Sequence, residues 1–424
     1  MNNLWSGGQY SLFRIVFGAY LFIHFVHLTP WASEIYSSTG VLPTASYSPI
    51  IHLFPNLLAL FDAPWFVSLF TGSAALASVL LIIGWKDKLA ALWLWYVLTC
   101  LFGRNPLTAN PSLPFVGWIL LAHLFIPAAP YGSWAAKGRV DPAGNWRMPE
   151  NIWAAAWIIT ALAYSYSGYT KLISPSWVEG TAVFHVLQNP LARPTFLREF
   201  LLTLPPVVLQ IATWLGLGLE LLFAPLALVR ALRPFLWLAM LLMHISLLIL
   251  IDFADLSFGM IISLAFIFDP AWIRPLHKPV TDTVFYDGHC GLCHRTVRFL
   301  LAEGSPSAFR FAPLQSKTFE QTLTKDRRRD LPDSIVLLTH DDRILIYSSA
   351  VVYIFQRLGG AWRIVGTLLS LVPRALRDAA YRFIAAIRYK LFEQPGAVCP
   401  LIPKQLQDRF VFEIKSESVR REQA

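Results

Sequence analysis

The sequence predicts an α-helical membrane bundle of about eight spans, followed by a small α/β domain. Three observations predict this class. The chain of 424 residues is 55% hydrophobic and only 14% charged, whereas soluble domains carry about 25% charged residues. Apolar stretches of roughly the length that crosses a bilayer recur as far as Trp272. After Thr283 the pattern changes to short apolar runs that alternate with amphipathic segments.

The membrane domain is expected to occupy residues 1–272. Its predicted spans, about eight in number, are residues 11–30, 64–84, 89–103, 113–127, 151–169, 206–229, 234–251 and 254–272. The third and fourth are short for a crossing. No positively charged region precedes the first apolar stretch, so we expect no cleaved signal peptide.

Lysine and arginine are unevenly distributed among the connections. Residues 31–63 contain none, whereas the connections 84–88, 131–150 and 230–233 are basic. Because basic connections stay in the cytoplasm, an even number of spans leaves both termini there. We therefore expect an integral protein of a bacterial inner membrane whose C-terminal domain is cytoplasmic.

The net charge of +9 suggests a negatively charged partner, either a lipid surface or nucleic acid. The basic residues flank apolar spans, which favours an anionic lipid surface as the partner and argues against nucleic acid. Four cysteines in a chain of this length do not form a disulfide scaffold. Cys100 lies within an apolar span and is expected to be inert packing.

The soluble part follows a linker at residues 273–283 that is rich in Pro, Lys and His. Its pattern predicts a thioredoxin-like order, in which a β-α-β unit precedes a β-hairpin and a helix. The expected strands are 284–286, 309–312, 334–339 and 343–347, and the expected helices are 290–302 and 349–358. The domain is expected to span residues 284–400, with a charged tail at 401–424. A basic amphipathic stretch, 373–392, either lies on the inner leaflet or completes the domain.

Cys290 and Cys293 stand where the first of these strands passes through a polar loop into a helix. Unpaired N–H groups and the dipole at a helix N-terminus stabilise a thiolate. Cys290 is therefore the expected nucleophile and Cys293 the resolving thiol. A protonated His289 would assist Cys290. Asp287 would disfavour the thiolate but could pass protons between the two cysteines.

A structural zinc site is the competing interpretation of the same spacing. Cys399, His289 or His294 would then complete the ligands of a half-site that begins with Cys290 and Cys293. The preceding strand and the lack of a second Cys-x-x-Cys pair favour redox chemistry. We expect no bound metal.

The soluble part resembles the DCC family of thiol-disulfide oxidoreductases. The resemblance implies a thioredoxin-like fold and protein-disulfide exchange. The matching blocks are Asp287 to Cys293, Phe309 to Gln315, Asp333 to Leu337, Ser349-Ala350, Leu358 to Gly360, Leu376 to Asp378, Tyr381, Arg388-Tyr389 and Cys399-Pro400.

The membrane part resembles the HTTM domain that vitamin K-dependent gamma-carboxylases contain. The matching residues are Phe13 to Ile15, Gly18, Gly40 to Pro43, Gly168 to Lys171, Trp177 to Ala182, Glu220 and His244. In the carboxylases the lysine that corresponds to Lys171 acts as a base. Carboxylase activity is not implied, because the chain has no room for their large lumenal region.

Ionisable residues inside the spans are candidates for a binding site. Lys171, Glu220 and Arg14 are the weak candidates for a cofactor, and Arg14 is expected to pair with Glu220. The alternative is that these groups hold the helices together.

The sequence therefore predicts a membrane-tethered thiol-disulfide oxidoreductase. Its substrate would be a disulfide-bearing protein or a small thiol compound, and it would need no cofactor beyond the dithiol. Two alternatives remain open: a lipid- or quinone-binding membrane protein whose dithiol is a sensor, and a zinc-stabilised interaction module.

Overall fold

The computed structural model describes residues 3–108, 110–132, 144–276, 280–305, 307–329, 331–332, 335–391 and 404–411. The chain divides into two compact units. The helical unit comprises Met1–Asn3, Ser11–Lys137 and Met148–Phe268, and the sheet unit comprises Leu4–Tyr10, Gly138–Arg147 and Asp269–Ala424. Each unit has its own architecture and is described separately.

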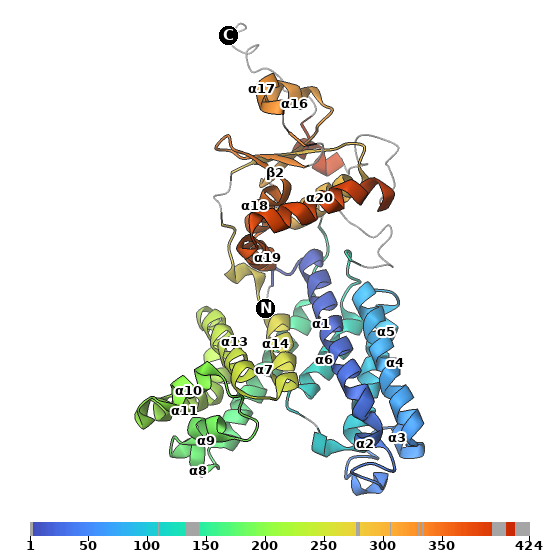
Figure 1. Ribbon diagram of the computed structural model, residues 1–424, viewed down its shortest axis with the longest axis vertical. Helices are drawn as coiled ribbons and strands as arrows, with labels where there is room; N and C mark the ends of the chain where they lie inside the picture. The colour runs from blue at the N-terminus through green and yellow to red at the C-terminus, as the bar shows by residue number, and fades with distance from the viewer. Residues whose placement is uncertain are drawn as a thin grey trace. The chain divides into compact units, whose positions relative to one another are not determined.

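The helical unit is built from apolar helices (Figure 1). Its helices are α1 (Gly7–Leu28, which starts in the sheet unit), α2 (Ala32–Tyr36), α3 (Leu57–Leu60), α4 (Pro64–Ile83), α5 (Asp87–Arg104), α6 (Leu113–Phe125), α7 (Glu150–Lys171), α8 (Pro175–Val178), α9 (Ala182–Gln188), α10 (Phe196–Leu202), α11 (Pro206–Leu221), α12 (Phe223–Ala227), α13 (Arg233–Leu250) and α14 (Ala254–Ile267). Each stretch that the sequence assigned to a span is helical over most of its length.

Fewer of these helices than expected have the length and hydropathy of a membrane span. In the described residues, Gly7–Tyr36, Pro64–Ile83 and Arg230–Leu250 qualify, and a fourth span results if α10 and α11, bent by 111°, are taken together. The expected count of about eight is therefore not reached. The 13 residues of α6 and the 14 of α14 are short, since a crossing needs about 20.

Local sequence explains two further departures from the expected spans. The stretch 206–229 is not one helix, because α11 ends at Leu221 and the proline-containing helix α12 follows. Helix α5 carries Asp87, Lys88 and Arg104 within its 18 residues, which lowers its hydropathy.

The sheet unit is built on four strands: β1 (Asp282–Tyr286), β2 (Phe309–Pro313), β3 (Val336–Leu338) and β4 (Ile344–Ile346). Their spatial order is β2-β1-β3-β4. Strand β2 runs parallel to β1, whereas β3 is antiparallel to β1 and to β4. Helix α15 (Gly291–Glu303) connects the two parallel strands, as such a pair requires.

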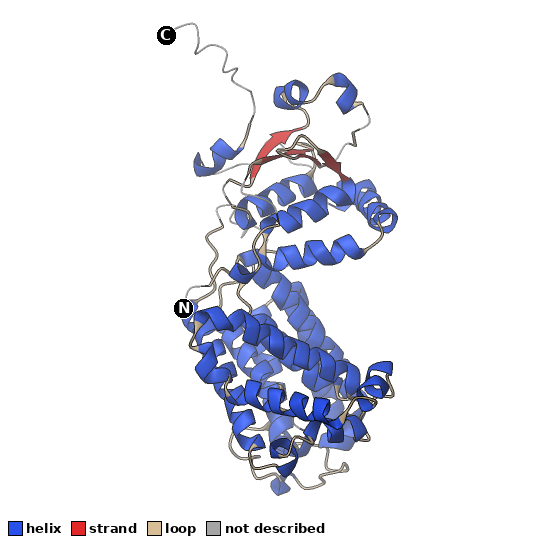
Figure 2. Ribbon diagram, turned by 90° about the vertical axis from the view of Figure 1, so that its left-hand side faces the viewer, coloured by secondary structure: helices blue, strands red, loops and turns tan. Residues whose placement is uncertain are grey.

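Both faces of this sheet are covered by helices (Figure 2). Val284 and Tyr286 point to one face, where α15 and α18 (Tyr347–Leu358) pack, and Phe285 points to the other. This alternation follows from the two-residue period of a strand. The helices after the hairpin are α18, α19 (Gly360–Leu371) and α20 (Arg374–Leu391), and the short helices α16 (Lys317–Thr322) and α17 (Lys325–Arg328) follow β2.

The segment 404–411 lies within the expected charged tail and packs against the sheet unit. A 3-10 helix covers Lys404–Arg409, and the buried side chain of Phe410 joins the core beside Phe311. The backbone N–H of Val411 donates to the carbonyl of Phe311. The apolar Phe410 explains why this part of the segment packs. Residues 412–424 lie outside the described part of the chain.

Candidate thiol site at the start of helix α15

Cys290 is the N-cap residue of α15. Its backbone is extended, with φ −104° and ψ 116°, and its Sγ accepts a hydrogen bond from the backbone N–H of Cys293 at 3.4 Å. Serine, threonine or aspartate usually supplies this interaction through oxygen. Here the sulfur occupies that position, so it receives a backbone donor and the positive end of the helix dipole.

The pKa values of the two thiols are shifted in opposite directions. A hydrogen bond from the Cys293 side chain lowers the pKa of Cys290 to about 6, against the opposing effect of burial. Backbone N–H groups at the helix start and the charge of Arg388 contribute to the same lowering. The same hydrogen bond, together with burial and the negative charge on Cys290, raises the pKa of Cys293. At neutral pH the pair therefore consists of a Cys290 thiolate and a Cys293 thiol.

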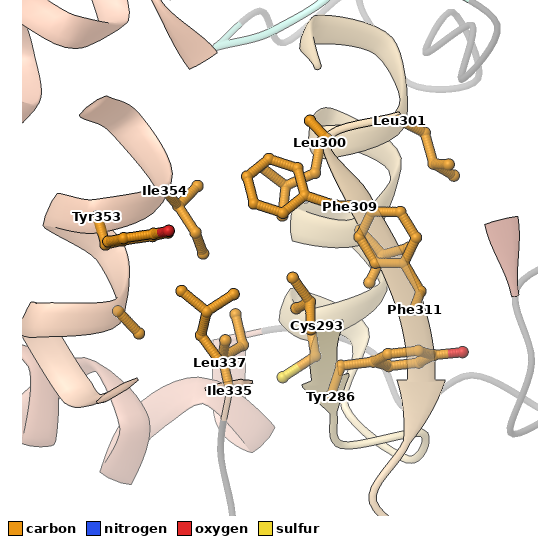
Figure 3. Close-up of a cluster of buried hydrophobic side chains, with 14 of the residues drawn as sticks. Tyr286, Cys293, Leu300, Leu301, Phe309, Phe311, Ile335, Leu337, Tyr353 and Ile354 are labelled. Atoms are coloured by element: carbon orange, nitrogen blue, oxygen red, sulfur yellow. The ribbon is translucent and has the colours of Figure 1, made fainter. Parts of the chain in front are cut away.

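Both thiols are reduced and buried, with exposed fractions of 1% for Cys290 and 4% for Cys293. Figure 3 shows Cys293 in the apolar cluster with Tyr286, Ile335 and Leu337. Burial among apolar side chains disfavours a charged Cys293.

Asp287 organises the loop that precedes the dithiol. Its Oδ1 accepts from the backbone N–H of His289 at 3.0 Å and from Nε2 of Gln315 at 3.2 Å. Its Oδ2 accepts from the Tyr389 hydroxyl and lies 3.4 Å from Nη2 of Arg388. Burial alone would raise the pKa of Asp287, but these hydrogen bonds and the arginine charge lower it overall.

The surroundings of Asp287 favour a structural role in the loop over a role in proton transfer. The carboxylate accepts several hydrogen bonds, and its lowered pKa makes it a weak proton acceptor at neutral pH. A proton relay through Asp287 between the cysteines stays a prediction.

His289 contributes to the loop through its backbone. Its imidazole is exposed and makes no hydrogen bond with another residue that the structure describes. The neighbouring His294 is buried instead, and its Nε2 lies 2.9 Å from the carbonyl oxygen of Gly288. The contribution of His289 to the charge of Cys290 therefore stays a prediction.

Three residues of this site had no role assigned from the sequence: Arg388, Tyr389 and Gln315. Arg388 and Tyr389 come from α20 and reach a carboxylate that lies more than one hundred positions earlier. Their place in the family resemblance was the one signal that pointed to them.

A metal site finds no support in this part of the structure. Among the described residues, no group of three or more His, Cys, Asp and Glu side chains lies close enough to hold an ion. Cys399, one expected ligand, lies outside the described residues.

The comparisons with known proteins agree with this arrangement. The HTTM domain family matches residues 6–272. The DCC1-like thiol-disulfide oxidoreductase family matches residues 284–394. The chain belongs to the HTTM domain family and carries a DCC1-like domain. The HTTM domain and its apolar helices indicate a membrane protein.

Two curated relatives align with the DCC1-like domain. An uncharacterized protein, YuxK, of Bacillus subtilis (strain 168) is 33% identical over 129 residues, which are 30% of this chain and 92% of YuxK. A chloroplastic DCC family protein of Arabidopsis thaliana is 30% identical over 109 residues, which are 26% of this chain and 63% of that protein. No solved structure gives a significant match.

In the HTTM domain, Lys171 and Glu220 form an ion pair. The Lys171 ammonium also lies 4.6 Å from the centre of the Trp177 ring. The expected pairing of Arg14 with Glu220 is wrong, because Arg14 Nη2 donates to the carbonyl of Gly132 at 2.7 Å. Arg14 and Glu220 therefore contact different partners.

Proposed function

We propose that the DCC1-like domain is a membrane-tethered thiol-disulfide oxidoreductase that reduces disulfides with Cys290 and Cys293. The observation that supports this function most strongly is the difference in pKa between the two thiols, lowered for Cys290 and raised for Cys293. A thiolate at the helix start and a protonated thiol one turn later are the two groups that exchange requires. The sheet order β2-β1-β3-β4 and the helix between the parallel strands β1 and β2 support the thioredoxin-like fold that the family resemblance implies.

In the proposed reaction the Cys290 thiolate attacks one sulfur of a substrate disulfide. A Cys290–substrate bond forms, the substrate S–S bond breaks, and the leaving sulfur takes a proton. Cys293 then loses its proton and attacks Sγ of Cys290, which releases the second substrate thiol and leaves a Cys290–Cys293 disulfide. Two electrons pass from the dithiol to the substrate, and an external dithiol reductant restores the starting state.

The proposal gives Arg388 and Asp287 positioning roles. Arg388 stabilises the charge on Cys290, and Asp287 holds both Arg388 and the loop in place. Stabilising the thiolate also stabilises the reduced dithiol, so it makes the Cys290–Cys293 disulfide easier to reduce.

We further propose that the dithiol faces the cytoplasm of a bacterial cell. The support is the alternation of basic connections in the HTTM domain. A reducing compartment would keep the dithiol ready to donate electrons. Neither bound lipid nor quinone is needed for this half-reaction.

The test is single-turnover reduction of oxidised glutathione by the full-length protein in detergent. The wild type should lose two thiols per chain and form the Cys290–Cys293 disulfide. Cys290→Ser should leave the glutathione unreduced, and Cys293→Ser should stop at a Cys290–glutathione adduct that mass spectrometry detects. Equal reduction by the wild type and Cys290→Ser would refute the proposal.

A further inference from the structure

A large cavity lies within the HTTM domain, away from the Lys171–Glu220 pair. Its volume is about 610 Å³, which falls in the range of about 300–1,000 Å³ typical of ligand pockets. The second half of α1, the end of α5 and the start of α14 form its walls. Most of the wall is aliphatic or aromatic, as Ile23, Leu101 and Phe258 illustrate.

A polar cluster interrupts this apolar wall. Asp255, in the first turn of α14, accepts at Oδ1 from the Tyr20 hydroxyl at 3.1 Å, and the same oxygen lies 2.8 Å from His24 Nδ1. Its Oδ2 accepts from Asn110 Nδ2 at 2.7 Å. All four residues line the cavity. The carboxylate of Asp255 therefore has three hydrogen-bond partners within the protein, without a ligand.

The histidine of this cluster keeps one nitrogen available. The contact with Asp255 occupies Nδ1 of His24, so Nε2 is the ring nitrogen that remains for a ligand. Nε2 has no hydrogen-bond partner in the part of the chain that the structure describes. His27 lines the cavity three residues further along the same helix face, and it too makes no hydrogen bond with a described residue.

We propose that this cavity binds an apolar molecule with a hydroxyl head group. The hydroxyl donates to Nε2 of His24, and the hydrocarbon part lies along the aliphatic and aromatic wall. The negative charge of Asp255 disfavours an anionic head group by charge repulsion. A ketone or ester offers no hydrogen to Nε2, so the site discriminates against molecules that lack a donor.

The test uses the full-length protein in nanodiscs and a photoreactive diazirine analogue of farnesol. Labelled peptides should come from the helices that line the cavity, α1, α5 and α14. Farnesol should suppress the labelling at roughly 3- to 10-fold lower concentration than farnesyl acetate, since one hydrogen bond separates the two competitors. This comparison needs no variant.

His24→Phe then removes the acceptor and keeps an aromatic ring. It should abolish the preference for farnesol over the acetate, whereas His185→Phe, on α9 and outside the cavity wall, should preserve it. The proposal is overturned if the alcohol and the acetate compete equally with the wild type, if His24→Phe keeps the preference, or if the label falls outside the cavity wall formed by α1, α5 and α14.

Discussion

Nη2 of Arg388 lies 3.4 Å from Oδ2 of Asp287, although 101 positions separate these residues in the chain. The contact joins α20 to the loop that precedes Cys290. Through it, a helix late in the domain brings a positive charge to the dithiol, and that charge lowers the pKa of Cys290. The reactivity of the helix start therefore depends on a distant part of the sequence.

Replacing Arg388 with glutamine should raise the pKa of Cys290 by about one unit, because a nearby positive charge that favours the thiolate is removed. The measurement is the pH dependence of iodoacetamide alkylation of Cys290, followed by peptide mass spectrometry. Arg382→Gln is the matched control, since Arg382 lies on the same helix but is exposed. An unchanged midpoint in Arg388→Gln would show that the charge does not act on Cys290.

Asp287 should make the stability of the DCC1-like domain depend on pH in the acid range. Its folded-state pKa is lowered, so the stabilisation is complete above the unfolded value of about 3.9 and is lost as the pH falls through the folded value. Thermal unfolding between neutral and acid pH should show a smaller acid-induced loss for Asp287→Asn than for the wild type. Parallel curves for the two proteins would contradict this role.

Asp282 should be essential to the stability of the sheet. It has an exposed fraction of 0%, and its Oδ2 lies 3.1 Å from Arg357 Nε and 3.3 Å from the Tyr353 hydroxyl. Asp282→Ala leaves a buried arginine uncompensated and should cost about 3–5 kcal/mol of unfolding free energy. Asp341→Ala, at an exposed position, should cost less than about 0.5 kcal/mol by the same denaturation assay.

The Lys171–Glu220 pair can be tested as a structural contact. Lys171→Met leaves Glu220 without its ion-pair partner and should lower the thermal midpoint in detergent, whereas Lys171→Met with Glu220→Met should recover part of the loss. Lys86→Met is the control, because Lys86 is exposed and also lies over an indole ring. A double variant less stable than Lys171→Met would argue against a simple pair.

The strands and helices of the sheet unit could be predicted because each has a local signal. The strand 284–286, the helix 290–302 and the hairpin 334–347 appear within two or three residues of their observed bounds. Apolar alternation and helix periodicity require no knowledge of distant residues. The placement of Cys290 at the start of α15 followed from the same local pattern.

The surroundings of the dithiol could not be predicted because they are not local. Arg388 and Gln315 reach Asp287 from α20 and from the loop after β2. One sequence contains no signal for such a contact. The same limit explains the incorrect pairing of Arg14 with Glu220, since charge and burial alone do not say which helices lie side by side.

The most direct test of the account is the pH profile of alkylation of both thiols in the reduced full-length protein. Peptide mapping would separate Cys290 and Cys293 from the other two cysteines. Cys290 should react with a midpoint near pH 6, and Cys293 should not react through neutral pH. Equal rates for the two thiols, with a shared midpoint near the ordinary cysteine value of about 8.5, would contradict it.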